Sequence, residues 1–313
     1  MLVQRFRGAL VGTAVGDALG APFEGRLRVG PKALERWSRS RAPLRWTDDT
    51  AMTIALAESL VASRGFDGPD LARRFTQRYF DDPHRGYGAG PPRIFAALRD
   101  GAQWDAPGRA VFGGKGSFGN GAAMRAAPAG LFARGDTAGA AALGRSSALV
   151  THSHELGQQG AAVQAAAVAV LVEADPGQGR DLLPRVLAAV RSHASAPEYS
   201  AAFDVLEEVH GASGDGHRVS PVAVVARIGN GIAASEAVPA ALHAALTHHG
   251  SFSDAVHYAI GLGGDTDTIA AMAGALSGAL LGYDAIPGEW LERLEAHDEL
   301  VALADRLLEA AAG

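Results

Sequence analysis

No cysteine occurs among the 313 residues of this chain. The absence excludes disulfide frameworks, cysteine–zinc sites, iron–sulfur clusters and thiol nucleophiles. Any metal ion that the side chains bind must therefore be held by oxygen atoms or by imidazole nitrogens.

The sequence also lacks an excess of basic residues. Lys and Arg number 28 against 34 Asp and Glu, so the formal net charge is −6. Proteins that bind nucleic acid through its phosphates need a basic face, so we expect no direct sequence-specific binding of nucleic acid. The charge balance still permits a small anionic ligand held by backbone N–H groups.

Long hydrophobic runs are missing as well. The N-terminal segment, with two arginines and a short apolar run, faintly resembles a signal peptide, but the run is too short to span a bilayer and acidic residues follow it. No other stretch approaches a membrane span. We therefore expect a cytoplasmic protein without membrane association, and we expect it to be a monomer.

Runs of alternating polar and apolar residues, which are typical of strands, are not evident. Ala and Leu are abundant, and apolar residues recur with helical spacing, so the sequence predicts an all-α fold, a compact orthogonal helical globule in one domain of residues 1–313. Small residues at 273–282 predict a central helix buried on most sides. The predicted helices cover residues 51–63, 122–132, 137–149, 155–173, 181–192, 197–210, 221–236, 239–249, 266–281 and 287–311, and the glycine-rich stretches 175–180 and 211–220 connect helices.

Two acidic motifs stand directly before apolar helices. The first is Thr47-Asp48-Asp49-Thr50 and the second is Gly263-Gly264-Asp265-Thr266-Asp267-Thr268. Thr and Asp are favoured N-caps, and the helix dipole favours acidic residues in a first turn, so helix capping is one interpretation of each motif. Capping requires one such residue or two, however, and both motifs contain more.

The alternative interpretation is a metal site. If the two helix starts meet in space, four carboxylates converge, and their mutual repulsion is on the order of several kcal/mol at a partly buried site. Protonation or a bound cation must relieve it. Ligation by oxygen alone favours Mg²⁺ or Mn²⁺, and two ions about 3.5–4 Å apart would suit this many carboxylates.

Other polar residues lie in suggestive surroundings. Glu24 follows a Pro-Phe pair among small and apolar residues, whereas Asp17 fits a helix-terminal hydrogen bond. The glycine-rich stretch 112–121 can present backbone N–H groups to phosphates, although it has no P-loop pattern, and a flexible surface loop is the other interpretation. His152 and His154 lack the spacing of a zinc-protease motif, which favours a hydrogen-bonding or capping role for His152.

These motifs, taken in order along the chain, resemble those of the ADP-ribosylglycohydrolase family, which includes dinitrogenase-reductase-activating glycohydrolase and the eukaryotic ADP-ribosyl-acceptor hydrolases. WTDDTAM and GGDTDTIA are the most specific of them. One departure lies at residues 89–92, where relatives often carry Thr after the RGYG loop. The matching blocks cover residues 8–24, 46–52, 85–88, 116–128, 151–157, 238–242 and 260–282.

The resemblance implies an all-α fold with a cleft that holds two divalent cations, Mg²⁺ or Mn²⁺. Glu24, Asp48 and Asp49 are then the candidate catalytic residues. The implied metal ligands are Thr47, Asp48, Asp49, Asp265, Asp267 and Thr268. The implied ADP-ribose-binding residues are Gly116, Ser117, Phe118, Gly119, Asn120, Gly121, Met124 and His152.

The resemblance further implies metal-dependent hydrolysis of the glycosidic bond between ADP-ribose and an acceptor, as in the reversal of mono-ADP-ribosylation. Arginine is the slightly favoured acceptor; serine, O-acetyl-ADP-ribose, poly(ADP-ribose) and nucleobase linkages stay open. The partners expected are ADP-ribose and an ADP-ribosylated protein or small molecule. The two alternatives are an inactive ADP-ribose-binding or structural relative and a binuclear-metal nucleotide phosphohydrolase.

Overall fold

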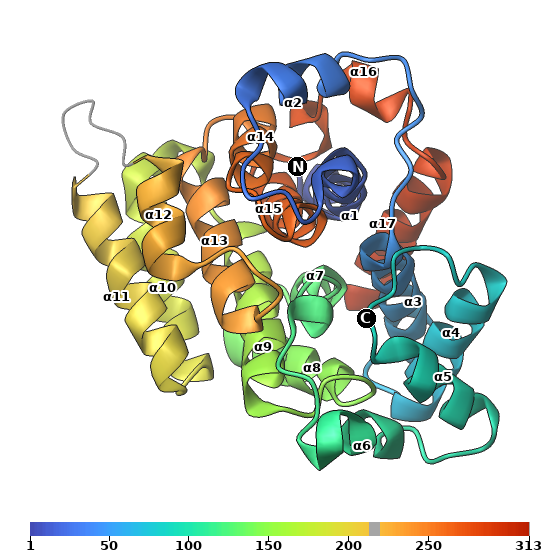
Figure 1. Ribbon diagram of the computed structural model, residues 1–313. Helices are drawn as coiled ribbons and strands as arrows, with labels where there is room; N and C mark the ends of the chain where they lie inside the picture. Colours follow the sequence, from blue (N-terminus) through green and yellow to red (C-terminus); the bar gives the residue numbers. More distant parts are fainter. Residues whose placement is uncertain (213–219, 313) are drawn as a thin grey trace.

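The computed structural model describes residues 1–212 and 220–312, and within these residues it is built from helices, with no strand beyond isolated bridging pairs (Figure 1). The predicted all-α fold is therefore confirmed. The α-helices are α1 Leu2–Gly20, α2 Pro31–Ser38, α3 Asp48–Ser63, α4 Gly68–Asp81, α5 Pro91–Arg99, α6 Ala106–Gly114, α7 Ala127–Phe132, α8 Thr137–Ala148, α9 Glu155–Leu171, α10 Leu182–Val190, α11 Pro197–Ala212, α12 Pro221–Ile228, α13 Ala234–Thr247, α14 Phe252–Gly261, α15 Thr266–Leu281, α16 Gly288–Leu291 and α17 His297–Ala311. Short 3₁₀ helices lie at Ala21–Phe23, Asn120–Ala122, Pro176–Asp181, Arg191–His193 and Tyr283–Ala285.

The helices α1 and α15 lie side by side at the centre of the molecule (Figure 1). Small residues spaced four apart face one another along the pair, and they let the two backbones touch: a Cβ atom added at Gly12 would lie 2.5 Å from the carbonyl oxygen of Gly274. The pairing is antiparallel, so the start of α15 lies at the end of α1. The facing pairs are Gly8 with Gly278, Gly12 with Gly274, Gly16 with Ala270 and Gly20 with Thr266.

The central position of α15 agrees with the prediction from its small residues. Nearly the whole helix is buried, and its observed bounds match the predicted 266–281. Several other predicted helices, namely 137–149, 155–173 and 197–210, agree with α8, α9 and α11 to within two residues. The predicted connection 175–180 lies between α9 and α10 and overlaps a 3₁₀ helix, and most of the other one, residues 213–219, lies outside the described residues.

Four predicted helices have wrong bounds, and two of them, 221–236 and 287–311, merge separate elements. The span 221–236 is interrupted at Gly229, whose positive φ of 88° ends α12, and Pro239, taken as a helix start, lies inside α13. The span 287–311 breaks before α17, and the span 122–132 contains only α7. The segment between α12 and α13 leaves the helical layer to contact residues 118–120.

Among residues 1–212 and 220–312, no helix combines the length with the apolar composition that crossing a membrane requires.

Candidate active site

The start of α3 is held by a carboxylate from α1. Asp17 is completely buried, and its two oxygens accept hydrogen bonds from the backbone N–H of Thr47, each at 2.9 Å. One of them also accepts from the N–H and the hydroxyl of Thr50, at 3.1 and 2.6 Å. The interpretation of Asp17 as a helix-terminal hydrogen-bond acceptor is confirmed, although the helix that it serves is α3. With these N–H groups satisfied by Asp17, the side chains of Asp48 and Asp49 are not needed as caps.

The start of α15 is held by loop backbone. Gly263 and Gly264 both adopt positive φ, at 74° and 73°, which allows the loop to pass close beside residues 26–27 and Asn230. The N–H of Gly264 donates to the carbonyl of Arg26 at 2.8 Å, and the N–H of Asp265 donates to the carbonyl of Asn230 at 2.9 Å. Because α1 ends here, the same contacts bring the segment that contains Glu24 to the start of α15.

The two acidic motifs meet in space, which is the condition that the metal-site interpretation of the sequence required. The hydroxyls of Thr47 and Thr268 lie 3.3 and 3.4 Å from the same oxygen of Asp49, so the α3 and α15 motifs are in direct contact. Carboxylate oxygens of Glu24, Asp265 and Asp267 lie within 4.8 Å of one another. We call these residues the acidic wall: Glu24, Thr47, Asp48, Asp49, Asp265, Asp267 and Thr268.

The electrostatics of the acidic wall are unfavourable for a cluster of ionised carboxylates. Burial, reinforced by neighbouring carboxylates, raises the pKa of Asp48 to about 8 and that of Asp267 to about 9. The same causes raise the pKa of Asp49 well above its ordinary value and also raise the pKa of Glu24. In addition, Oδ1 of Asp49 is buried without a hydrogen-bond partner. A set of converging, partly unsatisfied oxygen donors is the donor chemistry that hard divalent cations require.

The opposite side of the site is formed by a loop and a histidine. Residues 117–121, with Met124 and His152, form what we call the neutral wall. The loop is tied down by backbone pairing, because the N–H of Asn120 donates to the carbonyl of Ile232 at 2.9 Å. The side-chain amide of Asn120 reaches across and donates to Asp265 at 2.7 Å. This hydrogen bond joins the two walls.

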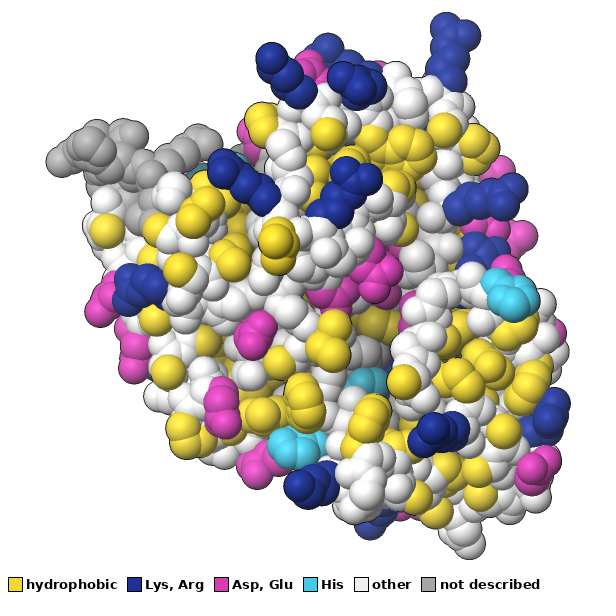
Figure 2. Space-filling model, viewed as in Figure 1, with side chains coloured by type: hydrophobic (Ala, Val, Ile, Leu, Met, Phe, Trp, Pro, Cys, Tyr) yellow, Lys and Arg dark blue, Asp and Glu magenta, His cyan; other side chains and the backbone are white. Residues whose placement is uncertain are grey.

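Both walls line one pocket of about 280 Å³. Its lining includes most of the residues proposed from the sequence, and it excludes Thr47, Gly116 and Phe118. Gly116 packs against Ser153 and His154, and the ring of Phe118 is 49% exposed and stands edge-on to His154, 6.0 Å away. Figure 2 shows acidic side chains gathered in a hollow near the middle of the visible face.

Comparisons with known proteins agree with this geometry. The family model described as ADP-ribosylglycohydrolase matches residues 1–313. The chain belongs to the ADP-ribosylglycohydrolase family. Zebrafish (Danio rerio) ADP-ribosylhydrolase ARH3 is 37% identical, with 98% of this chain and 90% of that protein covered. ADP-ribosylarginine hydrolase Tri1 of Pseudomonas putida (strain GB-1) is 28% identical over 99% of this chain and 79% of its own length. A solved structure titled "ADP-ribosylglycohydrolase-related protein complex" has a TM-score of 0.74 at 28% identity and covers 99% of both chains.

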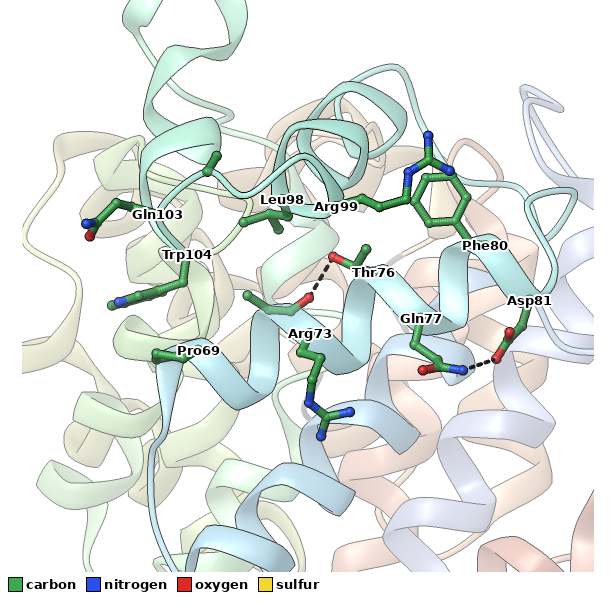
Figure 3. A pocket seen from close by; sticks show the side chains of 12 residues that line it. Pro69, Arg73, Thr76, Gln77, Phe80, Asp81, Leu98, Arg99, Gln103 and Trp104 are labelled. Carbon is green, nitrogen blue, oxygen red and sulfur yellow. Dashed lines mark hydrogen bonds between the residues drawn. The ribbon is translucent and has the colours of Figure 1, made fainter.

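Membership identifies the protein as an ADP-ribosylglycohydrolase, an enzyme that hydrolyses a glycosidic bond of ADP-ribose. The cluster of acidic residues, rather than the size of the cavity, distinguishes this pocket from a larger groove elsewhere on the molecule. A groove of about 850 Å³ between α4 and α5 (Figure 3) is larger, but Asp81 is its only lining carboxylate. Gln77 donates to Asp81 at 3.5 Å within the groove, and its lining presents no cluster of acids.

Sequence reasoning missed part of this ADP-ribosylglycohydrolase pocket. Arg125, Thr151 and Ile232 line it, and none of them was singled out. A signal for Arg125 existed, because it is the one charged residue in the small and apolar stretch 121–132. Ile232 could not be found this way, since its segment was assigned to a continuous helix.

Proposed function

We propose that the protein is a divalent-metal-dependent hydrolase that releases ADP-ribose from an ADP-ribosylated acceptor. The observation that carries the proposal is the convergence of Glu24, Asp265 and Asp267 beside Asp49, in a pocket whose other side offers hydrogen-bond donors. Like charges this close to one another call for a cation, and the glycosidic bond calls for carboxylates near the anomeric carbon.

The residues that would hold two cations, Mg²⁺ or Mn²⁺, come from the starts of α3 and α15. When bound, the cations would supply positive charge that orients ribose hydroxyls and acidifies a water molecule at the sugar. The proposed ligands are Thr47, Asp48, Asp49, Asp265, Asp267 and Thr268.

Proton transfer, stabilisation of the transition state and binding of the diphosphate are assigned to residues of the chain. Among Glu24, Asp48 and Asp49, we assign proton transfer to Glu24, because it is the most exposed of the three and has no hydrogen-bond partner among the described residues. The neighbouring carboxylates stabilise the positive charge that develops on the ribose in an oxocarbenium-like transition state. The loop that carries Ser117, Gly119, Asn120 and Gly121 binds the diphosphate, while Met124 and His152 line the same subsite. Gly116 and Phe118 lie outside the pocket lining and would contact only the adenosine end.

Arginine is the acceptor that we would test first, because the Pseudomonas relative is an ADP-ribosylarginine hydrolase by name. Serine, O-acetyl-ADP-ribose, poly(ADP-ribose) and nucleobase conjugates complete the panel. We further propose that the protein acts as a cytoplasmic monomer with one domain, residues 1–313.

A panel of defined ADP-ribosyl conjugates, incubated with Mg²⁺, with Mn²⁺ and with EDTA, tests the proposal. We expect release of free ADP-ribose from at least one conjugate, and we expect EDTA to abolish it. Binding of ADP-ribose without release from any conjugate would point to an inactive relative. Release of inorganic phosphate in place of ADP-ribose would point to a phosphohydrolase.

A further inference from the structure

Arg125 is a fully buried cation whose hydrogen bonds go to neutral groups. Its Nη1 donates to the carbonyl of Gly121 at 2.9 Å, and its Nη2 donates to the carbonyl of Ser147 at 3.1 Å and to the hydroxyl of Thr151 at 2.8 Å. The guanidinium carbon stands 4.5 Å from the centre of the Phe75 ring. Because the planar group is held from several sides, its bond to Thr151 has a fixed direction.

That bond determines the role of the threonine hydroxyl. A guanidinium can only donate, so Oγ1 of Thr151 accepts, and its own hydrogen remains available for donation. The nearest polar atom is Nδ1 of His152, 2.7 Å away. Among the described residues the Thr151 hydroxyl has no other acceptor. Nδ1 of His152 therefore accepts, and in a neutral ring the proton must sit on Nε2.

The neutral state of the ring has independent support. His152 is buried, and burial together with the nearby Arg125 cation lowers its pKa to about 3. One edge of the ring lies against the loop, because a Cβ atom added at Gly121 would stand 2.8 Å from Cε1 and 3.0 Å from Nε2. Within the described part of the chain Nε2 has no hydrogen-bond partner, while His152 lines the active-site pocket.

We propose that Arg125 and Thr151 are positioning residues that hold His152 as the neutral, Nε2-protonated tautomer, so that Nε2–H donates a hydrogen bond to the diphosphate of the substrate. The inference rests on the proposed function, which supplies the diphosphate ligand. The tautomer has a second consequence: a protonated Nε2 has no lone pair to offer, so the ring does not compete with the carboxylates for the cations.

The test uses the full-length protein and one methyl-for-hydroxyl exchange. Thr151→Val keeps the shape of the side chain but cannot donate to Nδ1, and Thr151→Ser restores the hydroxyl. The matched control is Thr13→Val, which removes an equally buried threonine hydroxyl from α1, where it donates to the carbonyl of Ala9 at 2.8 Å. Tautomers are read from ¹⁵N spectra of histidine-labelled protein, with His152→Gln used to assign the signal.

In the wild type we expect the His152 signal to report protonation on Nε2. In Thr151→Val we expect a mixture of tautomers and about a tenfold higher Kd for ADP-ribose, measured by calorimetry with Mg²⁺, while kcat changes less than threefold. Thr151→Ser and Thr13→Val should bind ADP-ribose as the wild type does.

Protonation on Nδ1 in the wild-type spectrum overturns the inference, whether or not any variant folds. Unchanged tautomer and unchanged Kd in a folded Thr151→Val protein overturn it as well. Neither measurement needs turnover, so failure of the proposed hydrolase activity is recognised separately, by the conjugate panel with the wild-type protein.

Discussion

The acidic wall and the neutral wall face each other across one pocket, yet their polar atoms are satisfied in different ways. On the acidic wall, carboxylates crowd together and Oδ1 of Asp49 is buried without a partner. Behind the neutral wall, a chain of hydrogen bonds runs from Nη2 of Arg125 through the hydroxyl of Thr151 to Nδ1 of His152, although Nε of Arg125 is buried without a partner. The acidic wall thus carries crowded like charges that a bound cation would relieve, whereas His152 on the neutral wall is already hydrogen-bonded within the protein.

The largest effect should follow from a change in the acidic wall. Asp48→Asn removes one carboxylate, and we expect kcat to fall at least about hundredfold, because charge stabilisation and metal binding are both weakened. The fold should survive, since one repelling charge has been removed from a buried cluster. The measurement is steady-state hydrolysis of the best conjugate, with circular dichroism as a check of helix content.

The matched control for that variant is Asp81→Asn. Asp81 is an exposed carboxylate in the groove between α4 and α5 (Figure 3), away from both walls. It should keep wild-type activity. Turnover close to that of the wild type in Asp48→Asn would remove the basis for treating the two walls as different.

Metal binding should stabilise the protein through the acidic wall alone. At a free Mn²⁺ concentration about a hundred times the Kd, the free energy of unfolding should rise by about 3 kcal/mol, seen as a higher Tm. The rise should shrink in Asp48→Asn and persist in His152→Gln. An equal rise in all three proteins would place the cation outside this cluster.

A substitution at Asn120, which forms the hydrogen bond between the two walls, tests whether the walls differ in this way. Asn120→Asp replaces the donor to Asp265 by another carboxylate and extends the acidic wall into the loop. We expect about 2 kcal/mol lower stability in metal-free urea denaturation, recovered in part by Mn²⁺. Asn120→Ala, which loses the bond without adding charge, should be affected less and should respond to Mn²⁺ as the wild type does; the reverse order would contradict this account.

The smallest expected effect is the loss of folding stability that His152, on the neutral wall, causes at acidic pH. His152 has a pKa of about 3 in the folded protein, below its ordinary value near 6.5. Below pH 6.5 the unfolded chain takes up a proton on this ring and the folded chain does not, so folding stability falls as the pH falls, until the folded pKa is passed. Between pH 7 and pH 5.5 the wild type should lose about 1 kcal/mol more than His152→Gln in urea denaturation. If the stability of the wild type and of His152→Gln fell in parallel as the pH fell, the pKa of His152 would not be lowered in the folded protein.

Much of the acidic wall could be predicted from short sequence patterns. Thr47-Asp48-Asp49 and Asp265-Thr266-Asp267 stand before apolar helices, and the observed α3 and α15 begin at or beside them. Local sequence contains this information because a helix start is set by its own first residues. The helices 221–236 and 287–311 were merged although Gly229 is a local stop signal, and the segments that follow or form their breaks pair with distant residues, namely 118–120 and Leu44.

The sequence by itself determined the helical class, the positions of the two acidic helix starts and the family resemblance, since all of these depend on residues that are neighbours along the chain. Only the tertiary structure decided that Asp17 would hold the start of α3, that Asn120 would reach Asp265, and that Arg125, Thr151 and His152 would form a hydrogen-bonded chain. Each of these depends on hydrogen bonds or burial created when the glycine-paired helices α1 and α15 bring remote segments together, and burial is also what shifts the pKa values on which the chemistry depends.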